Sequence, residues 1–432
     1  MEKLAEVKVF RDPIYTYIYV KDRIVWDLIN TKPMQRLRRI HQLGGTFQAF
    51  PSAEHTRFGH ALGVYEMARL LIETVPDLQE ALNEREQLLV KCAALLHDIG
   101  HGPFSHAMET LFQMDHEALS VQLILDQSGE IYPLLQKIDA TFAADVAAII
   151  AKKYPRELLV QLVSSQLDAD RMDYLRRDAY FSGVPYGNFD PVRILRVMRV
   201  VEDRVVFKES GMHAIENYIM SRYHMYWQIY FHPIGRSYEL VLAALVNRLR
   251  TLRTEGYQFQ VEPTLIFALM DQGQKIDLAT YLLIDENTIY YYVTMMTQEQ
   301  DESLAAISSR FLNRQLLQYC PDPDGTLFQK LSTLIERYSP QLLPLCVRDE
   351  PMVQQPYQYY QQSETKMIVP IEFVLPNGQV VEISEISPIV RAISQEEFVG
   401  EPLLFYPYQQ INELLQQHPE YQESLAVLLS EK

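Results

Sequence analysis

Apolar residues that recur at helical spacing are the feature that most constrains the fold of this chain. From Arg57 to Val75 the apolar positions repeat with a period of about 3.6 residues, and Glu86 to His97 shows the same pattern. By the same criterion, further helices are predicted at 116–126, 143–152, 156–177, 211–230 and 238–252. A chain with so many helical segments is expected to be mainly α-helical.

The two ends of the chain differ from this helical part. The first 30 residues are rich in β-branched and aromatic residues, which predicts a short hairpin leading into a helix, and TKP at 31–33 is typical of another helix start. Beyond residue 255, the alternating stretch 281–293 predicts a strand. The segment 367–386, which contains PNG at 376–378, predicts a hairpin.

These patterns suggest two domains. We expect a helical domain at 1–255 and a smaller mixed α/β domain at 256–432 that serves oligomerisation or regulation. The segments DPDG at 322–325 and QQPYQYYQQS at 354–363 are candidate linkers or mobile loops.

Charge and cysteine content exclude several classes of protein. The net charge of −17 argues against a protein that binds nucleic acid by neutralising many phosphates, although basic stretches at 31–60 and 171–204 could hold a small phosphorylated ligand. No apolar run is long enough for a bilayer, and the N-terminus lacks the pattern of a signal peptide. The three cysteines have no zinc-site spacing. We expect a cytoplasmic protein without membrane contact.

Histidines are concentrated in one part of the chain. Six of the 11 lie between residues 55 and 116, and His97 is followed directly by Asp98 at the end of a predicted helix. Imidazole and carboxylate groups together suit a divalent metal such as Mn, Fe, Mg, Ni or Zn. Two ligands do not complete a site, so His60 or an aspartate of the stretch 168–178 is expected to join them.

The stretch 168–178 (DADRMDYLRRD) is the second chemical feature. On a helix, Asp170, Tyr174 and Arg177 share one face, and Arg171 and Asp178 flank it. Such a face can offer a carboxylate to a metal and guanidinium groups to phosphate oxygens. No GxxxxGK[ST] or GxGxxG sequence occurs, which disfavours Walker-type ATPases and dinucleotide oxidoreductases.

Five strings together resemble a known family. They are QRLRRIHQLGG at 35–45, FPSAEHTRFGHALGV at 50–64, HDIGHGPFSH at 97–106, DHE at 115–117 and DADRMDYLRRD at 168–178. This ordered set resembles the deoxynucleoside triphosphate triphosphohydrolase branch of the HD-domain metal-dependent phosphohydrolases, over roughly residues 5 to 240. The resemblance implies an HD-type helical core and hydrolysis of dNTPs to deoxynucleosides and inorganic triphosphate.

The resemblance also implies roles for single residues. The implied metal ligands are His60, His97, Asp98 and Asp170. The residues implied at the α-phosphate are His101, His106, His116 and Glu117, with one histidine protonating the leaving 5′ oxygen and Glu117 orienting His116. Those implied to hold phosphates are Arg57, Arg171, Tyr174 and Arg222. Those implied at the sugar are Gln42, Leu43, Asp178 and Tyr230.

Regulation is the last property that the resemblance implies. Relatives form tetramers activated by a guanine nucleotide, so a homo-oligomer and a dGTP or GTP site at Lys8, Asn30, Gln35 and Arg38 are expected. Asn30 stands where an aspartate is usual, and its amide lacks the negative charge that reads guanine.

Two alternatives remain open from the sequence. One is another HD phosphohydrolase, such as a 5′-nucleotidase or a cyclic-nucleotide phosphodiesterase. The other is a protein that senses nucleotides without turnover. The phosphate-binding candidates exceed what a monophosphate needs, and the presence of all four implied metal ligands favours turnover.

Overall fold

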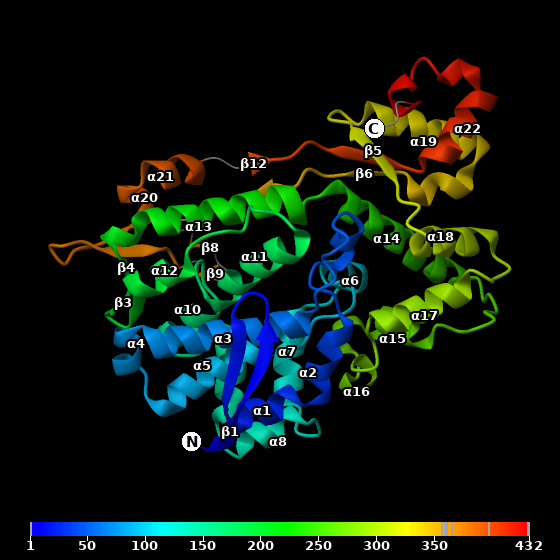
Figure 1. Cartoon of the computed structure of the whole chain (residues 1–432). Helices are drawn as coiled ribbons and strands as arrows, with labels where there is room; N and C mark the ends of the chain where they lie inside the picture. The colour runs from blue at the N-terminus through cyan, green and yellow to red at the C-terminus, as the bar shows by residue number, and fades with distance from the viewer. Residues whose placement is uncertain are drawn as a thin grey trace.

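Helices form most of the molecule, and its strands are gathered in small separate sheets (Figure 1). The computed structural model describes residues 2–355, 357, 362–363, 366–367, 369–395 and 398–429. The expected mainly α fold with an N-terminal hairpin and a mixed C-terminal region is confirmed. Among the described helices, none is both long and apolar enough to cross a bilayer.

The helices before residue 200 include the three that carry the predicted metal ligands. The α-helices in this part are α1 (Arg23–Ile29), α2 (Lys32–Arg36), α3 (Arg57–Thr74), α4 (Pro76–Ala81), α5 (Glu84–Leu96), α6 (His106–Phe112), α7 (His116–Leu125), α8 (Ile131–Gln136), α9 (Phe142–Ile150), α10 (Glu157–Val163), α11 (Ala169–Ser182) and α12 (Pro191–Val197).

The later helices form the far side of the molecule and its C-terminal part. They are α13 (Met212–Met225), α14 (Pro233–Thr254), α15 (Thr264–Gln272), α16 (Leu278–Tyr281), α17 (Glu286–Met296), α18 (Glu302–Leu312), α19 (Thr326–Tyr338), α20 (Ile383–Ile386), α21 (Pro388–Ser394) and α22 (Tyr408–Gln417). A π-helical turn at Tyr226–Tyr230 continues α13.

The strands are short outside the N-terminal hairpin. They are β1 (Lys3–Asp12), β2 (Thr16–Asp22), β3 (Met198–Val201), β4 (Arg204–Lys208), β5 (Gln318–Pro321), β6 (Val347–Asp349), β7 (Val353–Gln354), β8 (Gln362–Ser363), β9 (Lys366–Met367), β10 (Glu372–Val374), β11 (Val380–Glu382), β12 (Phe398–Val399) and β13 (Leu403–Tyr406).

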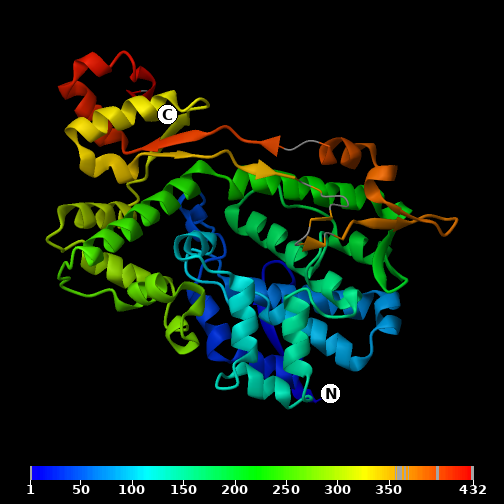
Figure 2. The ribbon, with the colours of Figure 1, turned by 180° about the vertical axis from the view of Figure 1, so that it is seen from behind.

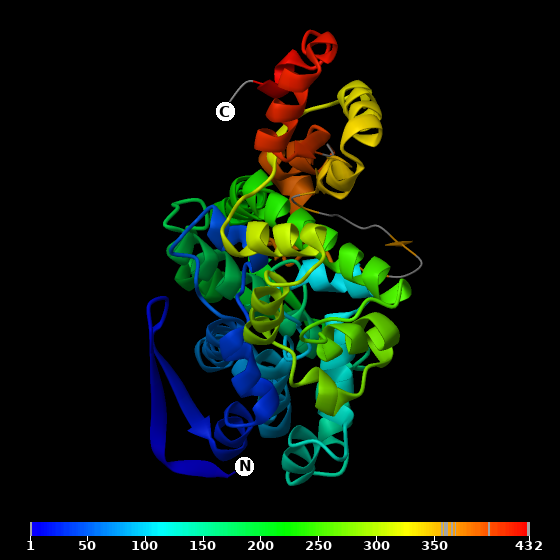
Figure 3. The ribbon, with the colours of Figure 1, turned by 90° about the vertical axis from the view of Figure 1, so that its right-hand side faces the viewer.

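The hairpin of β1 and β2 stands on one flank of the molecule (Figure 3). Ile18 and Val20 of β2 are buried against the body, which matches the alternation expected of a half-buried strand. The Tyr65 hydroxyl donates to the Tyr19 carbonyl at 3.0 Å, and the Tyr19 amide donates to Glu66 at 3.1 Å. The hairpin is therefore fastened to α3.

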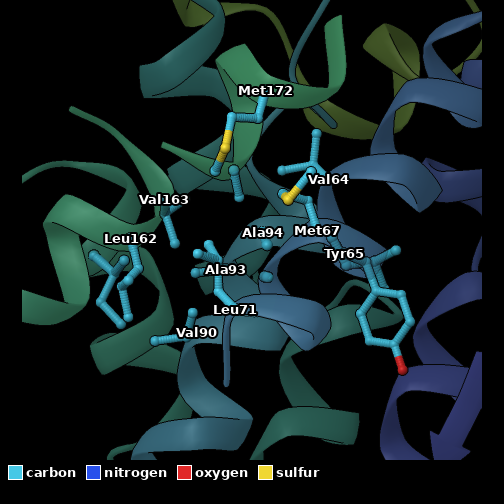
Figure 4. Packing of buried hydrophobic residues seen from close by; sticks show 14 of the residues in the cluster. Val64, Tyr65, Met67, Leu71, Val90, Ala93, Ala94, Leu162, Val163 and Met172 are labelled. Carbon is cyan, nitrogen blue, oxygen red and sulfur yellow. The ribbon is translucent and has the colours of Figure 1, made fainter. Parts of the chain in front are cut away.

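The first hydrophobic core is built around α3. Nearly every residue of α3 from Arg57 to Ile72 is buried, so this helix lies inside the molecule rather than on its surface. Figure 4 shows side chains of α3, α5, α10 and α11 gathered in this core, among them Val64, Ala93, Val163 and Met172.

A second core lies between α14 and the helices that follow it. Tyr238 of α14, Val293 of α17 and Phe311 of α18 are buried there. Phe104 and Phe112 belong to the same cluster. The loop after His97-Asp98 is thus held between the two cores.

The C-terminal part has a core of its own and also returns to the first one. α19 and α22 pack around the sheet β5–β13–β6, and an extended arm runs back over the body (Figure 2). There β10 pairs in parallel with β4, opposing Phe373 to Phe207, and Phe373 joins the first core. The domain boundary at residue 255 stays a prediction.

Two expectations about secondary structure were wrong. The helix expected at 156–177 is two helices, because Asp168 caps α11 through the Arg171 amide at 2.7 Å. The stretch 281–293 contains no strand: it is a turn after α16 followed by α17, since Asp285 caps α17 and Ile289, Val293 and Met296 are buried at helical spacing.

The other expectations for the C-terminal part had mixed outcomes. The hairpin around PNG is confirmed as β10 and β11. The segment 322–325 is a turn between β5 and α19, in which Asp322 is buried and accepts from the amides of Leu327 and Phe328 at 3.1 Å. Its mobility stays a prediction. Much of 354–363 lies outside the described residues.

Candidate active site

Three helices bring the four predicted metal ligands together. His60 lies in the first turn of α3, His97 and Asp98 follow the last turn of α5, and Asp170 lies in the first turn of α11. The chain turns away after Asp98 at Gly100. A Cβ there would lie 2.2 Å from the His116 carbonyl oxygen, so only glycine fits.

The ligand atoms face one another at short distances. His60 Nε2 lies 3.1 Å from Asp170 Oδ1 and 3.8 Å from Asp98 Oδ2. His97 Nε2 lies 3.6 Å from Asp170 Oδ1 and 3.4 Å from Asp98 Oδ1. His60, His97 and Asp170 place ligand atoms within 4.8 Å of one another, and Asp98, His101 and His116 form a second such group beside them. Imidazole nitrogens and carboxylate oxygens are donors suited to a divalent cation.

The outer nitrogen of each imidazole is already engaged. His60 Nδ1 lies 2.9 Å from Asp173 Oδ2, and His97 Nδ1 lies 2.9 Å from the Ala94 carbonyl oxygen. Both acceptors keep a proton on Nδ1, so a bound metal would take the Nε2 lone pair of each ring and displace any proton held there. The residues therefore fit the divalent metal that the sequence predicts.

Charges in the site shift the pKa values of its members. Burial lowers the pKa of His60, but hydrogen bonds to Asp170 and Asp173 outweigh burial and raise this pKa to about 10. Burial raises the pKa of Asp98, yet the nearby groups of His97, His101 and Arg57 bring it well below its usual range. The carboxylates are thus held in the charged form that a cation needs.

A pair of stacked imidazoles lies next to Asp98. The rings of His101 and His116 are 3.7 Å apart and nearly parallel. His101 Nε2 lies 3.4 Å from Asp98 Oδ1. Burial and the charge of Arg57 lower the pKa of His101 well below its ordinary value.

The carboxylate that contacts His116 is not the expected one. Glu109 of α6 pairs with His116 Nδ1, whereas the Glu117 carboxylate pairs with Lys152 at 2.7 Å. The first residues of α7 project in different directions, so adjacent residues do not share a face. The expected pairing of Glu117 with His116 is therefore corrected to Glu109. His106 begins α6, and its side chain lies outside the described part of the structure.

Arg57 is buried beside Asp98 and Ser105. It donates to Asp98 Oδ2 at 2.5 Å and to Ser105 Oγ at 2.8 Å. Phe104 and Ser105 have φ angles of 55° and 48°, in the left-handed region that non-glycine residues seldom adopt. Strained backbone of this kind is concentrated at functional sites.

The face of α11 is only partly as predicted. Tyr174 lies beside the His60 ring at a centroid distance of 6.4 Å, and Arg171 donates to Asp168 at 2.7 Å. Arg177 does not face the predicted metal ligands as Asp170 does. Its buried guanidinium pairs with Asp12 and Asp173.

Hydrogen bonds by way of His55 link three of the residues predicted at the sugar, namely Asp178, Tyr230 and Gln42. Asp178 accepts from the Tyr230 hydroxyl at 2.8 Å and pairs with His55 Nε2 at 2.8 Å. The backbone amide of Gln42 donates to the His55 carbonyl at 2.9 Å, and Leu43 packs against the first core. Arg222 lies over the ring of Tyr226 at 5.7 Å, and Tyr226 belongs to the same π-helical turn as Tyr230.

The residues predicted for the activator lie in two places. Around the α1–α2 junction, Asn30 donates to the Trp26 carbonyl, Gln35 donates to the Ile29 carbonyl, and Arg38 donates to Gln35 at 2.9 Å. Lys8 lies on β1 and pairs with Glu6 at 2.8 Å.

Four polar residues of the site were missed from the sequence. They are His55, Ser105, Glu109 and Asp173. Asp173 stands four residues before Arg177, a spacing that predicts an ion pair but not a contact with His60. Glu109 and Ser105 carry no signal of their own, because their neighbours depend on how α6 and α7 fold together.

One known protein matches nearly the whole of this chain, and others match about half of it. Residues 57–178 match the HD domain, and residues 189–264 match the HD associated region. The uncharacterised protein YwfO of Bacillus subtilis is 44% identical over 99% of this chain and 98% of its own length. The SAMHD1 homolog of Dictyostelium discoideum, a deoxynucleoside triphosphate triphosphohydrolase, is 32% identical over 55% of this chain and 48% of its own.

A solved structure is also similar to this chain over most of its length. The crystal structure of a phosphohydrolase from Bacteroides thetaiotaomicron has a TM-score of 0.79 at 27% identity, and the match covers 93% of this chain and 100% of that one. The chain therefore belongs to the HD-domain phosphohydrolases and is related to the SAMHD1 dNTPases.

Proposed function

We propose that this chain hydrolyses deoxynucleoside triphosphates to deoxynucleosides and inorganic triphosphate in a metal-dependent reaction. The observation that carries the proposal is the position of the stacked pair His101 and His116, with Arg57, directly beside the metal-binding set. The relatives named deoxynucleoside triphosphate triphosphohydrolase support the choice of substrate.

The reaction replaces the bond between the α-phosphorus and the 5′ oxygen by a bond to a water oxygen. A divalent cation held by His60, His97, Asp98 and Asp170 would supply Lewis-acid polarisation of the phosphoryl group. The leaving 5′ oxygen needs a proton, and His116, oriented by Glu109, is placed to donate it.

Charge on the phosphate oxygens must also be stabilised. Arg57 offers a guanidinium fork next to Asp98, where the phosphoryl oxygens would lie. His101 and His106 complete the proposed contacts to the α-phosphate. The residues proposed to hold the remaining phosphates are Arg171, Tyr174 and Arg222.

Sugar recognition is assigned to the group around Asp178. His55 and Tyr230 both hydrogen-bond this carboxylate and fix its orientation, so it can accept a hydrogen bond from the 3′ hydroxyl. Gln42 and Leu43 complete this part of the proposed site. The Gln42 side-chain oxygen is buried and has no partner among the described residues, so it is available to a ligand.

We extend the proposal to regulation and assembly. A guanine nucleotide, dGTP or GTP, is proposed to bind at Lys8, Asn30, Gln35 and Arg38 of a cytoplasmic homotetramer. A thermal-shift series with the four dNTPs and GTP tests this, because a bound nucleotide raises Tm. An unchanged Tm with every nucleotide at millimolar concentration would contradict it.

The central test is to identify the products. The metal-loaded protein is incubated with mixed dNTPs, and the products are separated by chromatography. Release of triphosphate and deoxynucleosides is expected. Pyrophosphate or phosphate release would instead indicate another HD phosphohydrolase, and nucleotide binding without any product would indicate a sensor.

Two variants separate metal binding from proton transfer. His97→Ala is expected to lose both metal and activity, because it removes an imidazole ligand. His116→Ala is expected to keep the metal and lose about 100-fold or more in kcat, since it removes only the proton donor. Metal content and kcat are measured on the same preparations, and near-normal turnover of His116→Ala would refute its role.

A further inference from the structure

A continuous line of buried charged groups joins the N-terminal hairpin to His60. Asp12 at the end of β1 pairs with Arg177 at 2.8 Å, Arg177 pairs with Asp173 at 2.8 Å, and Asp173 lies 2.9 Å from His60 Nδ1. Of the side chains, Asp12 is 7% exposed, Arg177 2%, Asp173 0% and His60 1%. Water does not screen these pairs, so each depends on its neighbours for charge compensation.

Asp12 uses its two oxygens for different purposes. Oδ1 accepts from the amides of Ile14 and Tyr15 at 2.8 and 3.1 Å and thereby shapes the hairpin turn. Oδ2 faces Arg177 Nη1. The turn of the hairpin is therefore locked to α11 by one carboxylate oxygen.

Arg177 grips Asp173 with the two-pronged geometry of its guanidinium group. Nε donates to Oδ2 at 2.8 Å, and Nη2 donates to Oδ1 at 2.9 Å. α3 passes this pair at Gly63, where a Cβ would lie 2.0 Å from Asp173 Oδ1 and 2.3 Å from Arg177 Nη2. Gly63 follows His60 by three residues, so the helix that carries the ligand also makes room for the pair.

The carboxylate of Asp173 decides which nitrogen of His60 carries the proton. A charged carboxylate only accepts hydrogen bonds, so Asp173 keeps a proton on Nδ1, and a cation bound between His60, Asp98 and Asp170 would take the Nε2 lone pair in place of a proton. Carboxylates in this position fix the orientation of metal-binding histidines and raise their basicity.

We propose that Asp173 positions His60 for the metal and that the hairpin, through Asp12 and Arg177, holds Asp173 in place. The N-terminal hairpin thus acts on the affinity of a site that it does not itself touch. This inference rests on the metal site of the proposed function.

Asp12→Asn is the sharpest test. The asparagine oxygen can still accept from the turn amides, while its amide group now faces the Arg177 donor and breaks the ion pair. Asp173→Asn weakens the contact with His60 directly. Arg176→Gln is the matched control, because Arg176 contacts the same hairpin turn, at the Ile14 carbonyl and the Tyr15 ring, but has no contact with Asp173 among those the structure gives.

Mn²⁺ affinity is measured by titration on the full chain, with Tm recorded for every variant. We expect Mn²⁺ affinity to fall by about 10- to 100-fold in Asp173→Asn and by about 3- to 10-fold in Asp12→Asn. Arg176→Gln should bind as the wild type does. The variant that carries both Asp12→Asn and Asp173→Asn should lose no more Mn²⁺ affinity than Asp173→Asn alone, since both changes act through one chain of contacts.

The Co²⁺ absorption spectrum supplies a readout that a general loss of stability would not move. Asp173→Asn and Asp12→Asn should alter the ligand-field bands, whereas Arg176→Gln should not. If Asp12→Asn does not fold, Arg177→Lys replaces it, because lysine keeps the charge but cannot bridge both carboxylates.

Failure of this inference and failure of the proposed metal site would give different results. Wild-type affinity and spectrum in folded Asp173→Asn and Asp12→Asn would overturn the inference alone. If His60→Ala also left metal affinity unchanged, the metal site of the proposed function would be overturned with it.

Discussion

At the scale of single residues, the geometry of the site is set by which carboxylate contacts each imidazole. Asp173 engages His60, Glu109 engages His116, and Asp178 engages His55. Carboxylate partners set the protonated nitrogen and the ring orientation of a histidine, so the chemistry of the site depends on residues that need not touch substrate.

The two glutamates near His116 should differ in their effect on turnover. Glu109→Gln is expected to lower kcat by about 10-fold or more, because it weakens the contact that orients His116. Glu117→Gln should cause the smaller loss, since Glu117 pairs with Lys152. Steady-state kinetics of both variants at saturating dNTP decide between them, and a larger loss for Glu117→Gln would contradict the assignment.

Two glycines of α3 give a matched pair for stability. Gly63→Ala is expected to lower the free energy of unfolding by about 3 kcal/mol, because its Cβ would collide with Asp173 and Arg177. Gly59→Ala meets only Arg177 Nη1, at 3.8 Å, and alanine favours a helix by about 1 kcal/mol. Urea unfolding of both variants is the measurement. Equal effects at the two positions would contradict the packing described for Gly63.

At the scale of elements, α3, α5 and α7 could be predicted because their apolar residues repeat at helical spacing. The break before α11 and the helix α17 could not be placed by that pattern alone. Asp168 and Asp285 cap these helices, and a capping aspartate in a sequence is hard to tell from a surface one.

α17 also holds the segment after α2 through a buried contact. His41 lies between Glu286 of α17 and Glu54, and its backbone amide donates to Glu286 at 2.9 Å. Burial lowers the pKa of His41, but the two glutamates outweigh it and raise the pKa to about 9. Because this pKa is above that of an unfolded chain, about 6.5, the stabilisation is full below pH 6.5 and disappears as pH rises through 9.

His41→Gln should therefore cost more stability at low pH than at high pH. We expect the free energy of unfolding to fall by about 2 kcal/mol more at pH 6 than at pH 9.5, after allowance for partial exposure of the pair to solvent. Urea unfolding of wild type and variant at both pH values measures the difference. The same loss at both values would show that the ion pairs do not contribute.

At the scale of the whole molecule, distant segments complete what local sequence begins. The strings around His60, His97 and Asp170 suggest a common site, but the link from Asp12 to Arg177 and the pairing of β10 with β4 each join residues some 165 positions apart. No local pattern predicts such contacts, because they depend on tertiary packing. The residues that perform the chemistry could thus be predicted from the sequence more readily than the distant residues that hold them in place.

The claim that matters most is that water attacks the α-phosphorus and the deoxynucleoside leaves. Hydrolysis of a dNTP in ¹⁸O-labelled water by the metal-loaded protein tests it directly, with mass spectrometry of both products. Our account predicts ¹⁸O in the triphosphate and none in the deoxynucleoside. Label in the deoxynucleoside, or deoxynucleoside monophosphate and pyrophosphate as products, would contradict it.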